Sequence, residues 1–273
     1  MAEIVGAFCL PHDPFITAFT ERAEPAQAAR IFAAFEEVRR EIARREADTV
    51  IVIGDDHYAL FGPNCQPQML VAVGDLEGPL EPWLRIERRP VPNNSPLAEH
   101  IVATGLAREF DFAVSTSLVL DHSVMVPVHL AVPDGTRVVP VYIASGVEPL
   151  IGWKRCHKLG QLLRESVQSW GADERVVILG TGGISHWVGT AEMGQVNPEF
   201  DRMALGLVES GDVAGLAELG DERILREGGN GAFELRNWMV AMGAMPGCRG
   251  RLIAYEPMEA WVTGLGLVEL EIA

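Results

Sequence analysis

The sequence predicts a single α/β domain built on a central mixed β-sheet flanked by helices. Short β-branched or apolar runs alternate with helical stretches along the chain, which is the pattern of an α/β sheet. One of the helical stretches, 26–46, carries Ile31, Phe35 and Val38 at spacings of four and three residues, so one of its faces is apolar. The chain has 273 residues, a length at which α/β folds often form one domain with one large core. We therefore expect one domain over 1–273.

The individual elements follow from the local pattern of apolar residues. The predicted strands are residues 4–9, 49–53, 69–73, 113–117, 138–143 and 176–179, with two closing strands at 252–255 and 266–272. Helices are expected at 26–46, 96–108, 151–170, 198–210 and 232–242, the last entered through the glycine-rich residues 228–231. Residues 74–94 are rich in Pro, Gly and Glu, so we expect a long surface loop there.

Composition and charge exclude several classes of protein. Hydrophobic residues make up 48 % of the chain, which indicates a globular protein and not a disordered one. The net charge of −16 repels phosphate groups, and Lys154 and Lys158 are the only lysines, so we expect neither nucleic acid nor a membrane as partner. The start of the chain lacks the pattern of a secretory signal, and no apolar stretch reaches the roughly 20 residues that span a bilayer. The four cysteines lie far apart, which predicts reduced thiols in a cytoplasmic protein.

Histidines follow several of the predicted strands. His12, His57 and His186 come shortly after the first, second and sixth strands, and His122 follows the strand at 113–117. Side chains just beyond the carboxyl ends of strands converge on one crevice in an open α/β sheet. A single histidine at a strand end is more often a structural residue, but four at equivalent places favour a shared active site at the carboxyl ends of the strands.

Imidazoles without thiolates suit a metal that accepts nitrogen and oxygen ligands. Two histidines and one carboxylate on one face of an octahedron leave three positions open, as in iron(II) oxygenases. Glu234 is the candidate carboxylate, because it lies in an otherwise apolar helix after the glycine-rich entry. The alternative for Glu234 is a helix-surface residue paired with Arg236 or solvent.

The ordered motifs resemble those of a known family, the class III extradiol ring-cleavage dioxygenases, which contains the protocatechuate 4,5-dioxygenase β subunit and 2,3-dihydroxyphenylpropionate dioxygenase. The resemblance runs over nearly the full length. It rests on Asp56-His57, Asp121-His122, the Gly-Thr-Gly-Gly-Ile-Ser-His stretch at 180–186, Asn197-Pro198-Glu199-Phe200-Asp201, Glu234 with Trp238, and the segment 261–266. The 180–186 stretch is specific, and the others gain weight from their order.

The resemblance implies an Fe(II) enzyme that opens a catechol-type ring with O2, as in aromatic catabolism. It implies that His12, His57 and Glu234 are the iron ligands and that His122 and His186 are the acid/base histidines. Imidazole pKa values near neutrality suit both proton transfers. Asp13 and Asp56, next to two of the histidines, either orient imidazoles or are solvated loop acids.

The substrate is less specified by the sequence. The resemblance suggests that the ring substituent lies near Thr263 and that Trp261 walls the pocket, whereas ordinary packing is the alternative for both. We expect a homo-oligomer, and a separate small subunit remains open as a further partner.

Two other functions compete with this one. A hydrolase that depends on zinc or another metal can use two histidines and a glutamate equally well. A noncatalytic subunit or ligand-binding relative could keep the fold without the activity.

Overall fold

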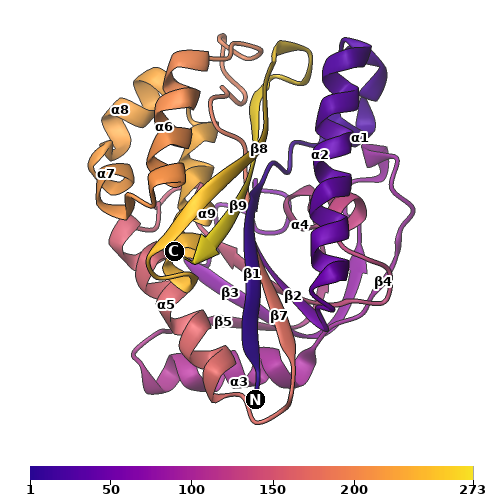
Figure 1. Ribbon diagram of the computed structural model, residues 1–273, viewed down its shortest axis with the longest axis vertical. Helices are drawn as coiled ribbons and strands as arrows, with labels where there is room; N and C mark the ends of the chain where they lie inside the picture. Colours follow the sequence, from indigo (N-terminus) through magenta and orange to yellow (C-terminus); the bar gives the residue numbers. More distant parts are fainter. Residues whose placement is uncertain (273) are drawn as a thin grey trace.

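The central sheet combines parallel and antiparallel strands. In the computed structural model, which describes residues 1–272, nine strands form one sheet in the order β4-β3-β6-β2-β7-β1-β9-β8, with β5 paired to β3 (Figure 1). The strands are β1 (Glu3–Leu10), β2 (Thr49–Asp55), β3 (Met69–Gly78), β4 (Arg89–Val91), β5 (Ala113–Val119), β6 (Arg137–Ile143), β7 (Arg175–Thr181), β8 (Cys248–Met258) and β9 (Thr263–Ile272). The predicted α/β fold with a mixed sheet is confirmed.

Four adjacent strands of this sheet run parallel and determine where the site can form. β6 pairs with β2, β2 with β7, and β7 with β1, all in parallel register. Their carboxyl ends therefore lie along one edge of the sheet. β9 runs antiparallel to β1, so its first residues reach past this same edge.

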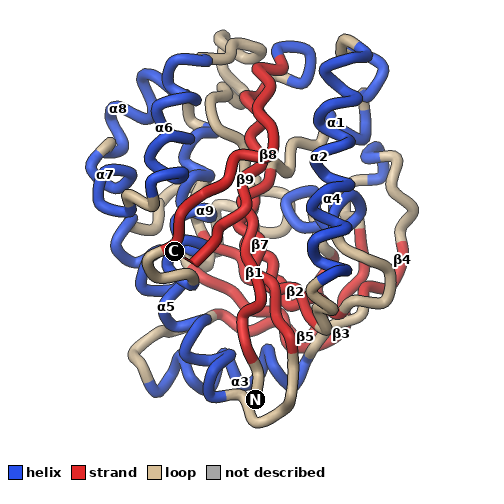
Figure 2. Tube along the Cα trace, in the orientation of Figure 1, coloured by secondary structure: helices blue, strands red, loops and turns tan. Residues whose placement is uncertain are grey.

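Helices cover both faces of the sheet (Figure 2). The helices are α1 (Phe15–Ala18), α2 (Pro25–Arg44), α3 (Ser95–Ala107), α4 (His122–Ala131), α5 (Trp153–Ser169), α6 (Pro198–Ser210), α7 (Val213–Glu218), α8 (Gly220–Gly228) and α9 (Leu235–Ala244). Buried side chains of α2 and α4 share one hydrophobic core, and those of α3, α5, α6 and α9 share the core on the opposite face. The two cores hold the parallel strands between them.

The helix predicted at 26–46 is present as α2. Its first turn is stabilised by the Glu24 side chain, which accepts a hydrogen bond of 2.8 Å from the Gln27 amide, and by Pro25 at the first helical position. Ile31, Phe35 and Val38 are buried, as their spacing predicts.

The expectation of a long loop at 74–94 was wrong. β3 continues to Gly78, a 3-10 turn covers Pro82–Leu84, and β4 pairs with the end of β3. These elements are short and rich in proline, so they leave little periodicity in the sequence. Helix α4 was also missed, because most of its residues are buried and it therefore has no polar face to mark a helical period.

Two further findings concern the chain as a whole. All four cysteines are free thiols, as expected. Among the described residues, no helix combines the length and the apolar character that a membrane crossing requires.

Candidate active site

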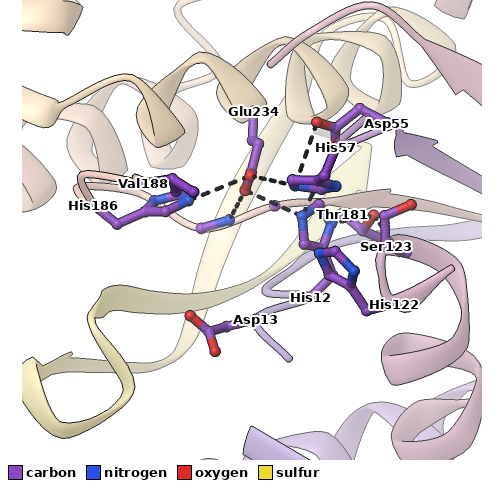
Figure 3. Close-up of polar contacts among 12 residues, drawn as sticks. His12, Asp13, Asp55, His57, His122, Ser123, Thr181, His186, Val188 and Glu234 are labelled. Carbon is purple, nitrogen blue, oxygen red and sulfur yellow. Dashed lines mark hydrogen bonds and ion pairs between the residues drawn. The ribbon is translucent and has the colours of Figure 1, made fainter. Parts of the chain in front are cut away.

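The predicted site residues come from different elements and lie at one edge of the sheet. His12 follows β1, His57 follows β2, and His186 follows β7 (Figure 3). Glu234 ends the 3-10 turn Gly231–Glu234 directly before α9, so it lies at a helix start and not inside a helix. His122 reaches the site as the first residue of α4. The strand before it, β5, runs parallel to β3, which is antiparallel to β6.

The Glu234 carboxylate is the centre of this group. Its Oε2 lies 3.3 Å from His12 Nε2, and its Oε1 lies 3.2 Å from His57 Nε2. The same Oε1 lies 3.3 Å from His186 Nε2. Glu234 is 2 % exposed and His12 is also 2 % exposed, so solvent does not separate these charges. The alternative, in which Glu234 pairs with Arg236 or solvent, does not hold, since Glu234 is buried and the Arg236 guanidinium is bonded to Asp221 instead.

A buried hydroxyl determines which nitrogen of His12 carries the proton. Thr181 Oγ1 lies 2.9 Å from the carbonyl oxygens of both Ile53 and Ser123, so it donates to a carbonyl. It can then accept from His12 Nδ1, which lies 3.0 Å away. This arrangement directs the Nε2 lone pair of His12 toward the Glu234 carboxylate. Two acceptors that face each other in a buried site require a cation between them, either a proton or a metal ion.

Two buried aspartates that are not among the predicted site residues stand behind this group. Asp55, the last residue of β2, lies 3.8 Å from His57 Nε2 and 3.9 Å from His12 Nε2. Asp121 Oδ2 lies 3.7 Å from His57 Nδ1. Asp55 Oδ2 and Asp121 Oδ2 are buried without a hydrogen-bond partner, as is His12 Nε2. The ligand atoms of His12, Asp55, His57 and Glu234 lie within 4.8 Å of one another, which is a spacing that one metal ion can bridge.

The electrostatics of the site favour positive charge. Burial lowers the pKa of His57, but the carboxylates of Asp55, Asp121 and Glu234 outweigh it and hold this pKa well above its usual range. Burial raises the pKa of Glu234, yet the imidazoles of His12 and His186 outweigh this effect and hold the pKa well below its ordinary value. The cluster therefore stabilises a shared cation at its centre.

His122 has a carboxylate partner of its own. Its Nδ1 lies 2.6 Å from Glu81 Oε1, and Glu81 comes from the segment that the sequence analysis took for a surface loop. The His122 ring lies 4.3 Å from the His57 ring and 5.7 Å from the His12 ring, measured between centroids. Glu81 thus fixes the orientation of His122 at the edge of the imidazole group.

Glycines allow the backbone to approach the site closely. The Gly183 amide donates to Glu234 Oε2 over 2.7 Å. A Cβ at Gly183 would lie 2.4 Å from the Thr263 methyl carbon, and one at Gly231 would lie 2.1 Å from His186 Nε2. The glycine-rich segments at 180–186 and 228–231 therefore exist because backbone and site side chains share the same space.

A cavity of about 180 Å³ opens above the imidazoles. It is smaller than the roughly 300–1,000 Å³ of pockets for drug-sized ligands, so it suits a ligand with a single ring. Its walls are mainly apolar, with Phe15, Val188 and Met193 among them. The full set of lining residues is His12, Asp13, Pro14, Phe15, His57, His122, Gly183, His186, Val188, Met193, Glu234, Val262 and Thr263.

The structure separates the remaining predicted residues. Asp13 and Thr263 line the cavity and are bonded to each other through Asp13 Oδ2 and Thr263 Oγ1. Trp261 is fully buried, is not among the residues that line the cavity, and donates from its indole to the Phe19 carbonyl over 3.2 Å, so it is a packing residue and not a pocket wall. Asp56 neither orients an imidazole nor is a solvated loop acid, because its buried carboxylate accepts the amides of residues 59–61 and fixes the following turn.

Fold and site together define a candidate α/β metalloenzyme with a pocket for a small ring. The chain belongs to the family described as the catalytic LigB subunit of aromatic ring-opening dioxygenase, which it matches over residues 6–266. The resemblance drawn from the ordered motifs is confirmed, and the protein is a ring-opening dioxygenase. Membership of this family does not favour the hydrolase or the noncatalytic alternative.

Named relatives agree with this assignment. The 2,3-dihydroxyphenylpropionate/2,3-dihydroxicinnamic acid 1,2-dioxygenase of Paraburkholderia xenovorans (strain LB400) is 28 % identical, over 94 % of this chain and 95 % of the relative. A gallate dioxygenase of Pseudomonas putida is 31 % identical over 57 % of this chain and 47 % of its own length. A crystal structure of an uncharacterized protein from Escherichia coli K12 shares the fold, with a TM-score of 0.60 and 12 % identity over 97 % of this chain and 99 % of its own.

Proposed function

We propose that this protein cleaves a catechol-type ring in the extradiol manner with O2, using one Fe(II) ion held by His12, His57 and Glu234. The observation that carries the proposal is the contact of two imidazole Nε2 atoms with one buried carboxylate, at 3.3 Å and 3.2 Å, on the floor of an apolar cavity. Two ligand atoms about 2.1 Å from one ion and at right angles to each other lie about 3 Å apart. The observed separations are close to that value.

The chemistry of these donors fits iron. Two imidazoles and a carboxylate form the set that leaves open positions on non-haem Fe(II). Asp55 adds a buried acceptor beside the same two imidazoles and strengthens the preference for a divalent cation. Iron(II) held there by His12, His57 and Glu234 would bind substrate and dioxygen and would supply the one-electron chemistry that side chains lack.

His186 is placed to take a proton from the substrate. Its Nδ1 lies 3.2 Å from the Ile184 carbonyl, which holds a proton on that nitrogen and leaves Nε2 as the basic atom. Burial lowers the pKa of His186, but Glu234, whose Oε1 lies 3.3 Å from Nε2, outweighs it and raises this pKa above its usual value, so Nε2 is a stronger base than a free imidazole. The ring borders the cavity, where a substrate hydroxyl can reach it.

His122 is the second acid/base residue in the proposal. Glu81 accepts its Nδ1 proton, so Nε2 is the nitrogen that can serve the substrate. The ring lies across the imidazole group from His186, and a proton can therefore be removed on one side of a bound ring and donated on the other. The apolar walls exclude water from the reacting atoms.

Reconstitution under anaerobic conditions tests this function. The protein is loaded with Fe(II), and oxygen uptake is followed with protocatechuate, gallate, dihydroxyphenylpropionate, aminophenol and plain catechols. We expect oxygen uptake together with a yellow ring-opened product. His12→Ala should abolish both, whereas His100→Ala, which removes a histidine on α3 outside the site, should keep them.

Two results would change the proposal. A stoichiometric zinc content without oxygen uptake on any catechol would overturn it in favour of a hydrolase. Activity only in the presence of a separate small subunit would leave the proposed reaction unchanged and would identify that subunit as a partner. The homo-oligomer and the small subunit are both predictions.

A further inference from the structure

One carboxylate in the cavity takes no part in the proposed iron site. Asp13 is 6 % exposed and lines the same cavity as the imidazoles of His122 and His186. Figure 3 shows its carboxylate apart from that of Glu234. It therefore borders the cavity away from the carboxylate that would hold the ion.

The contacts of Asp13 fix its position and leave it able to accept further hydrogen bonds. Oδ1 accepts the Phe15 amide at 2.6 Å, and Oδ2 is bonded to the Thr263 hydroxyl. A carboxylate has about four lone-pair sites, so two groups hold it in place while acceptor capacity remains. A buried acceptor of this kind is satisfied by a ligand that donates a hydrogen bond.

No side chain in the cavity offers a carboxylate on the substituent a guanidinium or ammonium partner. Among the described residues that line it, none is Lys or Arg. Arg22, the guanidinium stacked 4.1 Å from the Phe19 ring centroid, is exposed and is not part of the lining. A carboxylate on the substrate would thus lie in the same cavity as the Asp13 carboxylate with no Lys or Arg to pair with it.

We infer, on the basis of the proposed function, that the preferred substrate is a catechol whose ring substituent is a neutral or cationic hydrogen-bond donor, recognised by Asp13, and not a carboxylate. The relatives named above act by name on dihydroxyphenylpropionate and gallate, which are carboxylated compounds. The inference places this chain in a different substrate class from those relatives.

A matched series of ligands tests the inference without turnover. Dissociation constants are measured by anaerobic titration calorimetry on the Fe(II)-loaded protein for 3,4-dihydroxybenzylamine, 3,4-dihydroxybenzyl alcohol and protocatechuate, and for the corresponding 2,3-dihydroxy series. In at least one series the amine and the alcohol should bind at least tenfold more tightly than the carboxylate. Asp13→Asn should reduce the preference for the amine over the carboxylate, given as the ratio of their binding affinities, at least tenfold. Glu259→Gln, which removes an exposed acid four residues before Thr263, should leave this ratio unchanged.

The outcomes separate this inference from the proposed function. Carboxylates that bind as tightly as the amines in both series, or a ratio unchanged in Asp13→Asn, would overturn the inference. If Asp13→Asn does not fold, as judged by circular dichroism, the wild-type ratio decides alone. Oxygen uptake with protocatechuate as the best substrate would keep the proposed function and refute the inference. The expected binding ratio without oxygen uptake on any catechol would keep the inference and refute the function.

Discussion

Replacing Thr181 with valine should weaken iron binding without changing the shape of the site. Thr181 is fully buried, and its hydroxyl lies 3.0 Å from His12 Nδ1 and 2.9 Å from each of two carbonyl oxygens. Valine occupies almost the same volume but cannot accept the Nδ1 proton, so the imidazole loses the contact that directs Nε2 toward Glu234.

The magnitude follows from the loss of this one contact. Removing the outer partner of a metal-binding histidine typically costs about 10- to 100-fold in metal affinity, which corresponds to roughly 1.4–2.7 kcal/mol. The apoprotein should also lose roughly 1–3 kcal/mol of unfolding free energy, because the Nδ1–H is left buried without an acceptor.

Anaerobic titration with Fe(II) in a competing chelator measures the affinity, and urea unfolding of the apoprotein measures the stability. Thr181→Ser is the matched control, because it keeps the hydroxyl and should bind iron within about threefold of the wild type. Wild-type affinity in Thr181→Val, or an equal loss in Thr181→Ser, would show that the hydroxyl does not orient His12.

Three further predictions concern the contact of Glu81 with His122, the stability of the fold at acid pH, and the metal. Glu81→Ala should lower kcat with little change in KM. The decrease should be smaller than the loss of about 10²- to 10⁴-fold expected for His122→Ala, because Glu81 acts only through the imidazole that it orients. A raised KM at unchanged kcat in steady-state oxygen uptake would contradict this prediction. Partial burial, then Arg89 and Arg39, lower the pKa of His129 from its ordinary value of 6.5, so the folded state favours the neutral ring. The contribution of His129 to folding stability is therefore fully present above pH 6.5, and it is lost as the pH falls through the lower folded-state pKa. His129→Asn should therefore lose less unfolding free energy between about pH 7 and about pH 5 than the wild type, whereas equal losses in urea titrations would refute the assignment. Prolonged aeration without substrate should remove activity, and Fe(II) with ascorbate should restore it, since open coordination positions expose the ion to oxidation; activity that survives aeration and chelation would count against iron.

The parts of the fold that the sequence predicts are those with a strong local pattern. The buried strands β1, β2 and β7 are continuous apolar runs, and α2 has a clear apolar face, so both kinds of element can be located without tertiary information. β4 and α4 depend on long-range packing, which a local pattern does not carry. The residues just beyond parallel strand ends could be brought together because the topology of α/β sheets is restrictive.

The supporting residues of the site could not be predicted in the same way. Thr181 lies 169 positions from His12, and Glu81 lies 41 positions from His122, so neither pairing leaves a local signal. Asp55 and Asp56 are neighbours in the sequence, and Asp55 is the last residue of β2. Which of the two carboxylates faces the imidazoles depends on the side of the sheet to which the Asp55 side chain points. A strand alternates its side chains between two faces, so the parity of the strand end was the signal available.

Metal binding by single-residue variants tests the iron site most directly. Fe(II) is titrated anaerobically into the wild type and into His12→Ala, His57→Ala and Glu234→Ala, with circular dichroism as the check that each variant is folded. We predict one tightly bound iron per wild-type chain and the loss of tight binding in each of the three variants. Stoichiometric iron in a folded Glu234→Ala protein would contradict the site described above.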